Sequence, residues 1–186
     1  MPTPVGHSFA GIAVALAGEH GRRSGDFRGF LASPTTVLWM ALATLRDVDL
    51  LFPEYHRTAT HSVAATIVVA ILAAALTTRA NQTSDKADVL RRVAWSAIVL
   101  YAAAHASHLL LDWLNCDPSD RPGIQALWPF SDRWFSSGWC VFPGEERRHI
   151  FTVAATVRNL TVLAWELGIL GPVVVALWWL KQGWRE

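Results

Sequence analysis

Charged residues are scarce in this sequence, and their scarcity excludes one class of partner at once. Asp, Glu, Lys and Arg make up 17% of the 186 residues, below the roughly 25% of an average globular domain. The formal net charge is only +1, and no basic run is interleaved with aromatic residues, so we expect no nucleic acid partner. The chain has no low-complexity tract and no strong internal repeat, and its length suggests one domain over residues 1–186.

A secretory signal of the usual form is also missing. Residues 1–18 have no basic stretch at their start, and His7 interrupts the apolar run. Apolar residues, in contrast, are abundant: 52% of the residues are hydrophobic and ten are tryptophans. Positive hydropathy combined with little charge favours an integral membrane protein.

Long apolar runs set the expected architecture. They cover residues 5–18, 31–46, 61–78, 93–114 and 161–180. A transmembrane helix needs about 20 mostly apolar residues, so the last three runs qualify and the first two are short. We therefore expect an all-α, polytopic membrane bundle of four or five transmembrane helices, with Trp178 and Trp179 at a membrane interface.

Basic residues in the connecting segments predict the orientation. If there are five spans, loops 19–30 and 79–92 share one side with the C-terminal tail, and residues 47–60 and 115–148 lie on the other. The short loop of the second side contains only Arg57. The positive-inside rule then places the first side in the cytoplasm and makes 115–148 a long non-cytoplasmic loop. The basic residues of the first side are Arg22, Arg23, Arg28, Arg79, Lys86, Arg91, Arg92, Lys181 and Arg185.

The two cysteines both fall in this expected outward segment. Cys116 and Cys140 are separated by a stretch rich in Pro, Gly, Ser and Trp. Outside the cytoplasm two cysteines can form a disulfide that closes a loop, although the sequence leaves pairing and free thiols equally open.

Ionisable residues at the outward ends of the apolar runs are the most informative feature. Such groups are costly at the edge of hydrocarbon, and metal coordination is one way to offset that cost. Three separate parts of the chain bring them to one level of the membrane: His7, then Asp47, Asp49, His56 and His61, then His105, His108 and Asp112.

Spacing narrows the possibilities for some of these residues. His108 and Asp112 are four residues apart, so they share one face of a helix, and His105 lies two turns before Asp112. Imidazole and carboxylate at this spacing suit zinc or another first-row divalent ion. Asp47 and Asp49 would diverge on a helix but align in an extended segment.

Each residue also has a plainer interpretation. An HxxxD pair occurs by chance, and a lone histidine in a bundle is often a hydrogen-bonded packing residue, which applies to His7 and His105. Arg57 can be a phosphate clamp or an interfacial anchor. Glu166 can pair with Arg158 or another buried cation without any role in chemistry.

The order of the motifs resembles a known family. "GH" near the N-terminus, "DVDLL", "HRTATHS", "SHLLLDWL" and "GIQALWPF" follow one another between about residues 4 and 131. This order resembles that of the YdjM-like, LexA-regulated, membrane-bound metal-dependent hydrolases. More distantly, the family is similar to the zinc-dependent phospholipase C and P1 nuclease group, whose members are all-α enzymes with a multi-zinc cluster; this second likeness is at the level of fold.

The resemblance implies a metal site and an activity. It implies a membrane-bound, metal-dependent hydrolase, and the metal-site residues that it implies are Asp47, Asp49, His56, His61, His108 and Asp112, with His7 a further candidate. As a mechanism we expect two or three divalent ions, zinc above all, whose bound water attacks a phosphoester or ester of a lipid-like substrate. In this hypothesis Asp49 or Asp112 bridges ions, Asp47 is the general base, and Arg57 neutralises the developing oxyanion.

Two other functions remain open on the sequence. The cluster could carry a metal ion or protons across the membrane, which would require polar groups through its full thickness. The metal could also simply join helices, in a closed structural site. In all three cases the expected partners are membrane lipids, and the hydrolase would take an amphiphilic substrate from them.

Overall fold

The computed structural model describes residues 1–18, 26–51, 56–81, 87–116, 121–147, 149 and 151–183, with side chains left undescribed in 76–81, 87–94, 97 and 183. Arg22, Arg23, Lys86 and Arg185, which the orientation argument uses, lie outside these ranges. The described chain is mostly helical, as predicted. Its elements are α1 (Pro4–Gly18), α2 (Phe27–Leu31), α3 (Pro34–Thr44), the 3-10 helix η1 (Leu45–Leu51), α4 (Val63–Asn81), α5 (Ala87–Trp113), β1 (Asn115–Cys116), β2 (Phe142–Pro143) and α6 (Val153–Gly183).

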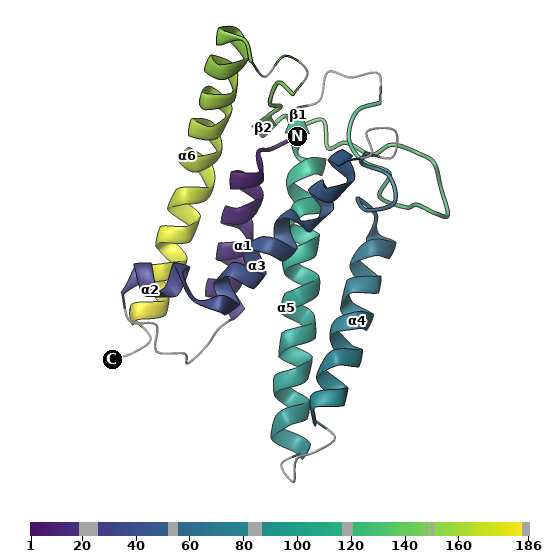
Figure 1. The fold of residues 1–186 in the computed structure, drawn as a ribbon, viewed down its shortest axis with the longest axis vertical. Helices are drawn as coiled ribbons and strands as arrows, with labels where there is room; N and C mark the ends of the chain where they lie inside the picture. The colour runs from purple at the N-terminus through teal and green to yellow at the C-terminus, as the bar shows by residue number, and fades with distance from the viewer. Residues whose placement is uncertain are drawn as a thin grey trace.

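Helix α1 lies at the centre of the bundle. It packs against α3, α5 and α6, whereas α4 packs along α5 to form a hairpin that extends away from the rest (Figure 1). Small residues let the central helices approach closely: a Cβ at Gly11 would lie 2.6 Å from the Trp39 carbonyl oxygen of α3. Ile12, Leu16 and Trp39 form the core beside this contact.

Helix α3 is shorter than the apolar run that predicted it. Ser33 caps its N-terminus by accepting a hydrogen bond from the Thr36 backbone nitrogen, and Pro34 occupies the first turn. The helix ends at Thr44 after 11 residues, a length of about 16 Å at 1.5 Å per residue. It therefore does not cross a bilayer core of about 30 Å by itself, in line with the short apolar run at residues 31–46.

The number of membrane spans is not confirmed. Within the described ranges, one helix, Val153–Gln182, is long and apolar enough to cross a membrane. Pro4–Gly18 and Val63–Ala75 are apolar but shorter. Helix α6 begins at Val153, before the apolar run at residue 161, because residues 153–160 belong to the same helix.

Large apolar side chains on the outer faces of the helices suit a lipid environment. Ile67, Ile71 and Leu72 of α4 and Trp165 of α6 are all exposed. The two tryptophans near the end of α6 differ in exposure and packing. Trp179 is 71% exposed, as expected for an interfacial residue, but Trp178 packs against the rings of Phe27 and Phe30 in α2.

The segment between α5 and α6 is cross-linked by backbone pairing and by a disulfide. β1 and β2 pair in parallel, with Asn115 opposite Phe142, and Cys116 forms a disulfide with Cys140. Ile124 bridges Phe135 in an isolated antiparallel pair. Gly123 lies between these ties with φ +90°, and a Cβ there would overlap the Phe135 carbonyl oxygen, so only glycine fits. Residues 117–120, 148 and 150 of this segment are outside the described ranges.

Candidate metal site

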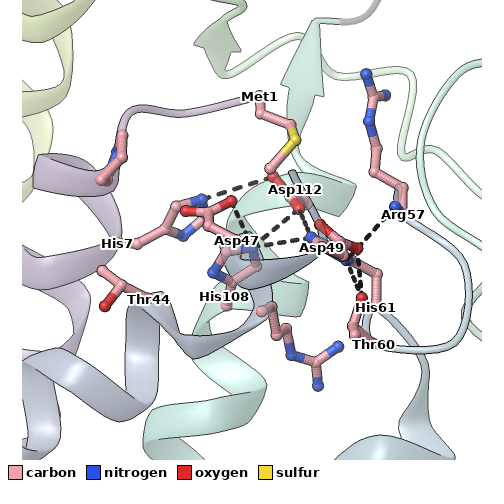
Figure 2. Close-up of polar contacts among 12 residues, drawn as sticks. Met1, His7, Thr44, Asp47, Asp49, Arg57, Thr60, His61, His108 and Asp112 are labelled. Carbon is pink, nitrogen blue, oxygen red and sulfur yellow. Dashed lines mark hydrogen bonds and ion pairs between the residues drawn. The ribbon is translucent and has the colours of Figure 1, made fainter. Parts of the chain in front are cut away.

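The predicted site residues meet at the end of the bundle that carries β1 and β2 (Figures 1 and 2). They come from four places in the chain, which the helix packing brings together. His7 lies in the first turn of α1, Asp47 and Asp49 lie in η1, and His61 precedes α4. His108 and Asp112 lie near the end of α5. Figure 2 shows their side chains turned toward one another.

Three side chains form the inner part of the site. His61 Nε2 lies 3.0 Å from His108 Nε2. Asp112 Oδ2 lies 3.1 Å from His61 Nε2 and 3.3 Å from His108 Nε2. All three residues are buried. Two ring nitrogens and a carboxylate oxygen thus face one small volume that is shielded from water.

Hydrogen bonds on the far side of each ring determine where the imidazole protons lie. His108 Nδ1 is 2.7 Å from the Ala43 carbonyl oxygen, which can only accept, so this nitrogen donates. His61 Nδ1 is 3.0 Å from Asp49 Oδ2 and donates to that carboxylate. In the neutral rings both Nε2 atoms are then unprotonated. Their lone pairs and Asp112 Oδ2 converge with no proton among them, an arrangement that a cation would stabilise.

His7 and Asp47 flank this inner group. His7 Nε2 is 3.7 Å from Asp112 Oδ1, and its ring stacks on that of His108 with centroids 3.5 Å apart. Asp47 Oδ1 is 3.7 Å from His108 Nε2. Within the described part of the chain, both ring nitrogens of His7 and all carboxylate oxygens of Asp47 and Asp112 are buried without a hydrogen-bond partner. Buried unsatisfied polar groups cost about 1–3 kcal/mol each, so a ligand is expected here.

Groups that could hold an ion can be identified from the distances between donor atoms. Within the described residues there are two: His7, His108 and Asp112, and Asp47, His61 and His108. Asp112 Oδ2 also lies 3.1 Å from Nε2 of His61, a member of the second group. His108 belongs to both groups but has only one free lone pair, because its Nδ1 donates to Ala43.

Asp49 has a different environment from Asp47. It accepts hydrogen bonds from His56 Nδ1 at 2.7 Å, the Arg57 backbone nitrogen at 3.1 Å, the Thr60 hydroxyl and His61 Nδ1. Burial opposes ionisation of this carboxyl, but the hydrogen bonds from His56, His61 and Thr60 outweigh it and lower its pKa well below the ordinary value. Since a carboxylate has about four acceptor positions, Asp49 is saturated by the protein.

The two aspartates diverge because the backbone between them is a 3-10 helix. With about three residues per turn, side chains two positions apart point in different directions. Burial raises the pKa of the Asp47 carboxyl, against the attraction of His108. Asp47 thus faces the ligand atoms, and Asp49 holds His56 and His61. The sequence predicts Asp49 as a ligand and Asp47 as a free base; in the structure the protein occupies the acceptor positions of Asp49, and Asp47 Oδ1 lies 3.7 Å from His108 Nε2.

His56 and Arg57 do not place their side-chain ends in the inner group. His56 Nε2 is 2.7 Å from Met1 Sδ, and the ring lies 5.5 Å from that of His61, centroid to centroid. Arg57, which has φ 63°, contacts the site through its backbone nitrogen. Its side chain points away from the aspartates (Figure 2), and Nη1 is 3.4 Å from the Gly123 carbonyl oxygen. The structure therefore does not place the Arg57 guanidinium beside the other predicted site residues.

Arg46 was not predicted as part of the site, yet it is buried directly beside it. Its guanidinium donates to the His105 carbonyl oxygen at 3.1 Å, to the Ser62 carbonyl oxygen at 3.3 Å and to His105 Nδ1 at 2.9 Å. This explains His105 as a partner of Arg46. An arginine at the end of an apolar run could have signalled such a role.

Glu166 also has a structural explanation. Its carboxylate accepts hydrogen bonds from the Thr3 backbone nitrogen at 2.7 Å and from the Thr3 hydroxyl at 2.5 Å. It thereby binds the N-terminus of α1 one turn before His7, where a negative charge is favourable. Arg158 instead donates to the Gly144 carbonyl oxygen, so the expected Glu166–Arg158 pair is not formed.

Comparison with known proteins gives one match. No curated protein and no solved structure matches the chain significantly. The sequence profile of the YdjM inner membrane protein family matches residues 1–184, a range that includes every helix and every residue of the candidate metal site. This coverage shows that the chain belongs to the YdjM family of inner membrane proteins.

Proposed function

We propose that this protein is a membrane-embedded, metal-dependent hydrolase that acts on a phosphoester or ester of a lipid-like substrate. One observation carries the proposal. The lone pairs of His61 and His108 and an oxygen of Asp112 converge within 3.0–3.3 Å in a buried volume. The resemblance of the motifs to metal-dependent hydrolases supplies the activity.

The donor set supports zinc or a similar divalent ion. Imidazoles and carboxylates are ligands that zinc prefers, and a catalytic zinc takes three of them and keeps its fourth position for water. We assign the first ion to His61, His108 and Asp112, with Asp47 beside the open position. The second oxygen of Asp112 and His7 are left for a second, weaker ion. When bound, such ions supply Lewis-acid polarisation of the scissile group and activation of water.

The remaining residues hold the ligands and move protons. Asp49 and the Ala43 carbonyl oxygen keep His61 and His108 in the tautomer that ligation needs. Asp49 also accepts a hydrogen bond from His56 Nδ1, and His56 Nε2 faces Met1 Sδ. The side chain of His56 is 16% exposed, more than any ligand of the first ion, so it lies on the open edge of the site. Both carboxylate oxygens of Asp47 lack a hydrogen-bond partner among the described residues, and we assign Asp47 as the general base.

We further propose that α1, α4, α5 and α6 cross the bilayer, as the bundle of four or five spans requires, with the site near the non-cytoplasmic face. The Cys116–Cys140 disulfide supports this orientation, because disulfides persist outside the cytoplasm. Cys116 follows Asp112 by only four residues, so the disulfide and the site lie at the same end of α5. An amphiphilic substrate would then reach the site by lateral diffusion in the outer leaflet.

A structural metal site is the second candidate, and one observation favours it. The side chains of His7, His61 and His108 have no exposed surface, as in a closed site that only joins helices. Transport has less support, since the described metal-ligating groups all gather at one end of the bundle. A closed site would bind metal without hydrolysing any substrate.

Metal analysis followed by a hydrolysis screen tests the proposal. Purified protein in a non-ionic detergent should contain at least one equivalent of zinc. It should also hydrolyse a phosphoester or carboxylic ester amphiphile. H108A should lose both properties, whereas H149A, which removes an exposed histidine, should keep them. A wild-type protein without bound metal would refute the proposal, and bound metal with no hydrolysis of any substrate would favour the structural site.

A further inference from the structure

The segment from residue 141 to 147 is held rigidly beside the site, although it contributes none of the predicted residues. Trp165 Nε1 donates to the Val141 carbonyl oxygen at 2.9 Å. Arg158 donates to the Gly144 carbonyl oxygen at 3.1 and 3.0 Å through two nitrogens. The Asn159 amide accepts from the Glu146 backbone nitrogen at 2.7 Å and donates to its carbonyl oxygen at 2.9 Å. Helix α6 therefore fixes the backbone that leads to Arg147.

Arg147 extends from this segment toward the edge of the candidate metal site. Glu145 binds one side of its guanidinium through Nε and Nη2. The other nitrogen, Nη1, lies 3.3 Å from Met1 Sδ and 3.4 Å from His56 Nε2. A thioether is a weak acceptor, and 3.4 Å is long for a contact of a guanidinium with a ring nitrogen, whereas a guanidinium binds oxyanions at about 2.7–2.9 Å.

The position of Arg147 is suited to a ligand that enters from the open edge. Its side chain is 27% exposed, so it can be reached from outside the site. Its guanidinium lies 3.4 Å from His56 Nε2 at this edge, whereas the Arg57 guanidinium points away from the aspartates.

We propose that Arg147 binds the anionic oxygens of a phosphoryl group at the open edge of the metal site and makes the protein selective for phosphoesters over neutral esters. This inference rests on the proposed function and deepens it. A guanidinium offers paired N–H donors that match two oxygens of a phosphate. A carboxylic ester has no second anionic oxygen to occupy them. Glu145 holds the guanidinium in place until a phosphate oxygen takes over part of its pairing.

Inorganic phosphate is a suitable probe, measured by calorimetry on purified, metal-loaded protein in a non-ionic detergent. R147Q should weaken phosphate binding roughly 10- to 100-fold, the loss typical of a hydrogen bond to a charged group. R147K, which keeps the charge but not the paired geometry, should fall between. R133Q is the matched control, because Arg133 is exposed in the same loop segment and its substitution changes the net charge equally.

A variant that should raise the phosphate affinity distinguishes phosphate recognition by Arg147 from a merely structural role. E145Q removes the competing carboxylate, so phosphate should bind several-fold more tightly, whereas a loss of structure would weaken it. A second probe, dihexanoyl phosphatidic acid, identifies the source of the phosphoryl group. If the lipid binds as well as phosphate, the phosphoryl group belongs to a lipid headgroup. If only phosphate binds, it belongs to a soluble phosphoester. Either result supports the role of Arg147 when R147Q weakens the binding.

Failure of this inference can be told apart from failure of the metal site. If R147Q contains metal and binds phosphate like the wild type, or if only R57Q loses phosphate, the inference is overturned. If the wild type contains no metal but still binds phosphate through Arg147, the anion site stands and the proposed hydrolase does not.

Discussion

Single protons decide which atoms of the site are available to an ion. His61 and His108 each donate from Nδ1, to Asp49 and to the Ala43 carbonyl oxygen, so that both Nε2 atoms face inward as acceptors. One of these partners is a backbone atom and cannot be altered by substitution. The other is a side chain, which makes Asp49 the residue through which the orientation of a ligand can be tested.

D49N should weaken metal binding without removing a direct ligand. Asn cannot accept hydrogen bonds from His56, Arg57, Thr60 and His61 together, because half of its end is a donor. Loss of such an orienting partner typically costs 10- to 100-fold in metal affinity. Competition with a chromophoric chelator would measure the change, with D132N at an exposed loop position as the control. An affinity equal to that of the wild type would argue against an orienting role.

H7A should distinguish one ion from two. His7 lies beside Asp112 Oδ1, whereas His61 and His108 lie beside Oδ2, so Asp112 can bridge. We expect H7A to lose one of two metal equivalents and D112A, which removes the bridging carboxylate, to lose both, as measured by elemental analysis of purified protein. If H7A loses all its metal, His7 belongs to the first ion and the assignment to a second ion is wrong.

At the level of elements, helical periodicity made the pair in α5 predictable, whereas the 3-10 helix η1 made the directions of Asp47 and Asp49 unpredictable. The spacing of His108 and Asp112 correctly predicted a shared face, because an α-helix brings residues four apart together. The separation of Asp47 from Asp49 depends on η1, and nothing in "DVDLL" distinguishes that turn from an extended segment. Apolar runs likewise predicted the helices but not their lengths, since Ser33 and the start of η1 limit α3.

The contact between α1 and α6 leads to a stability prediction. A Cβ at Gly6 would lie 2.5 Å from Glu166 Oε2, so G6A should displace α1 or its bond to Glu166. Overpacking of this kind costs about 1–3 kcal/mol. A Cβ at Gly168 on α6 would meet no atom within 4 Å, and G168A should be neutral or stabilising by up to about 1 kcal/mol. Thermal unfolding in detergent would compare them, and equal destabilisation by both would show that the close contact is unimportant.

The molecule as a whole has two unlike ends. The disulfide, β1, β2 and the candidate site gather at one end, and α2 lies toward the other (Figure 1). An integral membrane protein of this form presents one end to each compartment. The disulfide and the distribution of basic residues are independent observations, and both support our proposal that the site end is the non-cytoplasmic one. The orientation would determine which leaflet can supply a substrate.

Cysteine labelling in intact cells tests the orientation directly. Ser136 and Arg28 are both exposed, and the segments that contain them lie at opposite ends of the molecule. In a background of C116S and C140S, a thiol introduced by S136C should react with a membrane-impermeant maleimide added outside. A thiol introduced by R28C should react only after the membrane is permeabilised, because α2 would face the cytoplasm. Labelling of R28C but not S136C in intact cells would invert the orientation, and the substrate would then have to come from the inner leaflet. Metal content of both variants should equal that of the C116S/C140S background, because neither position touches the site, and this confirms that the labelled protein is folded.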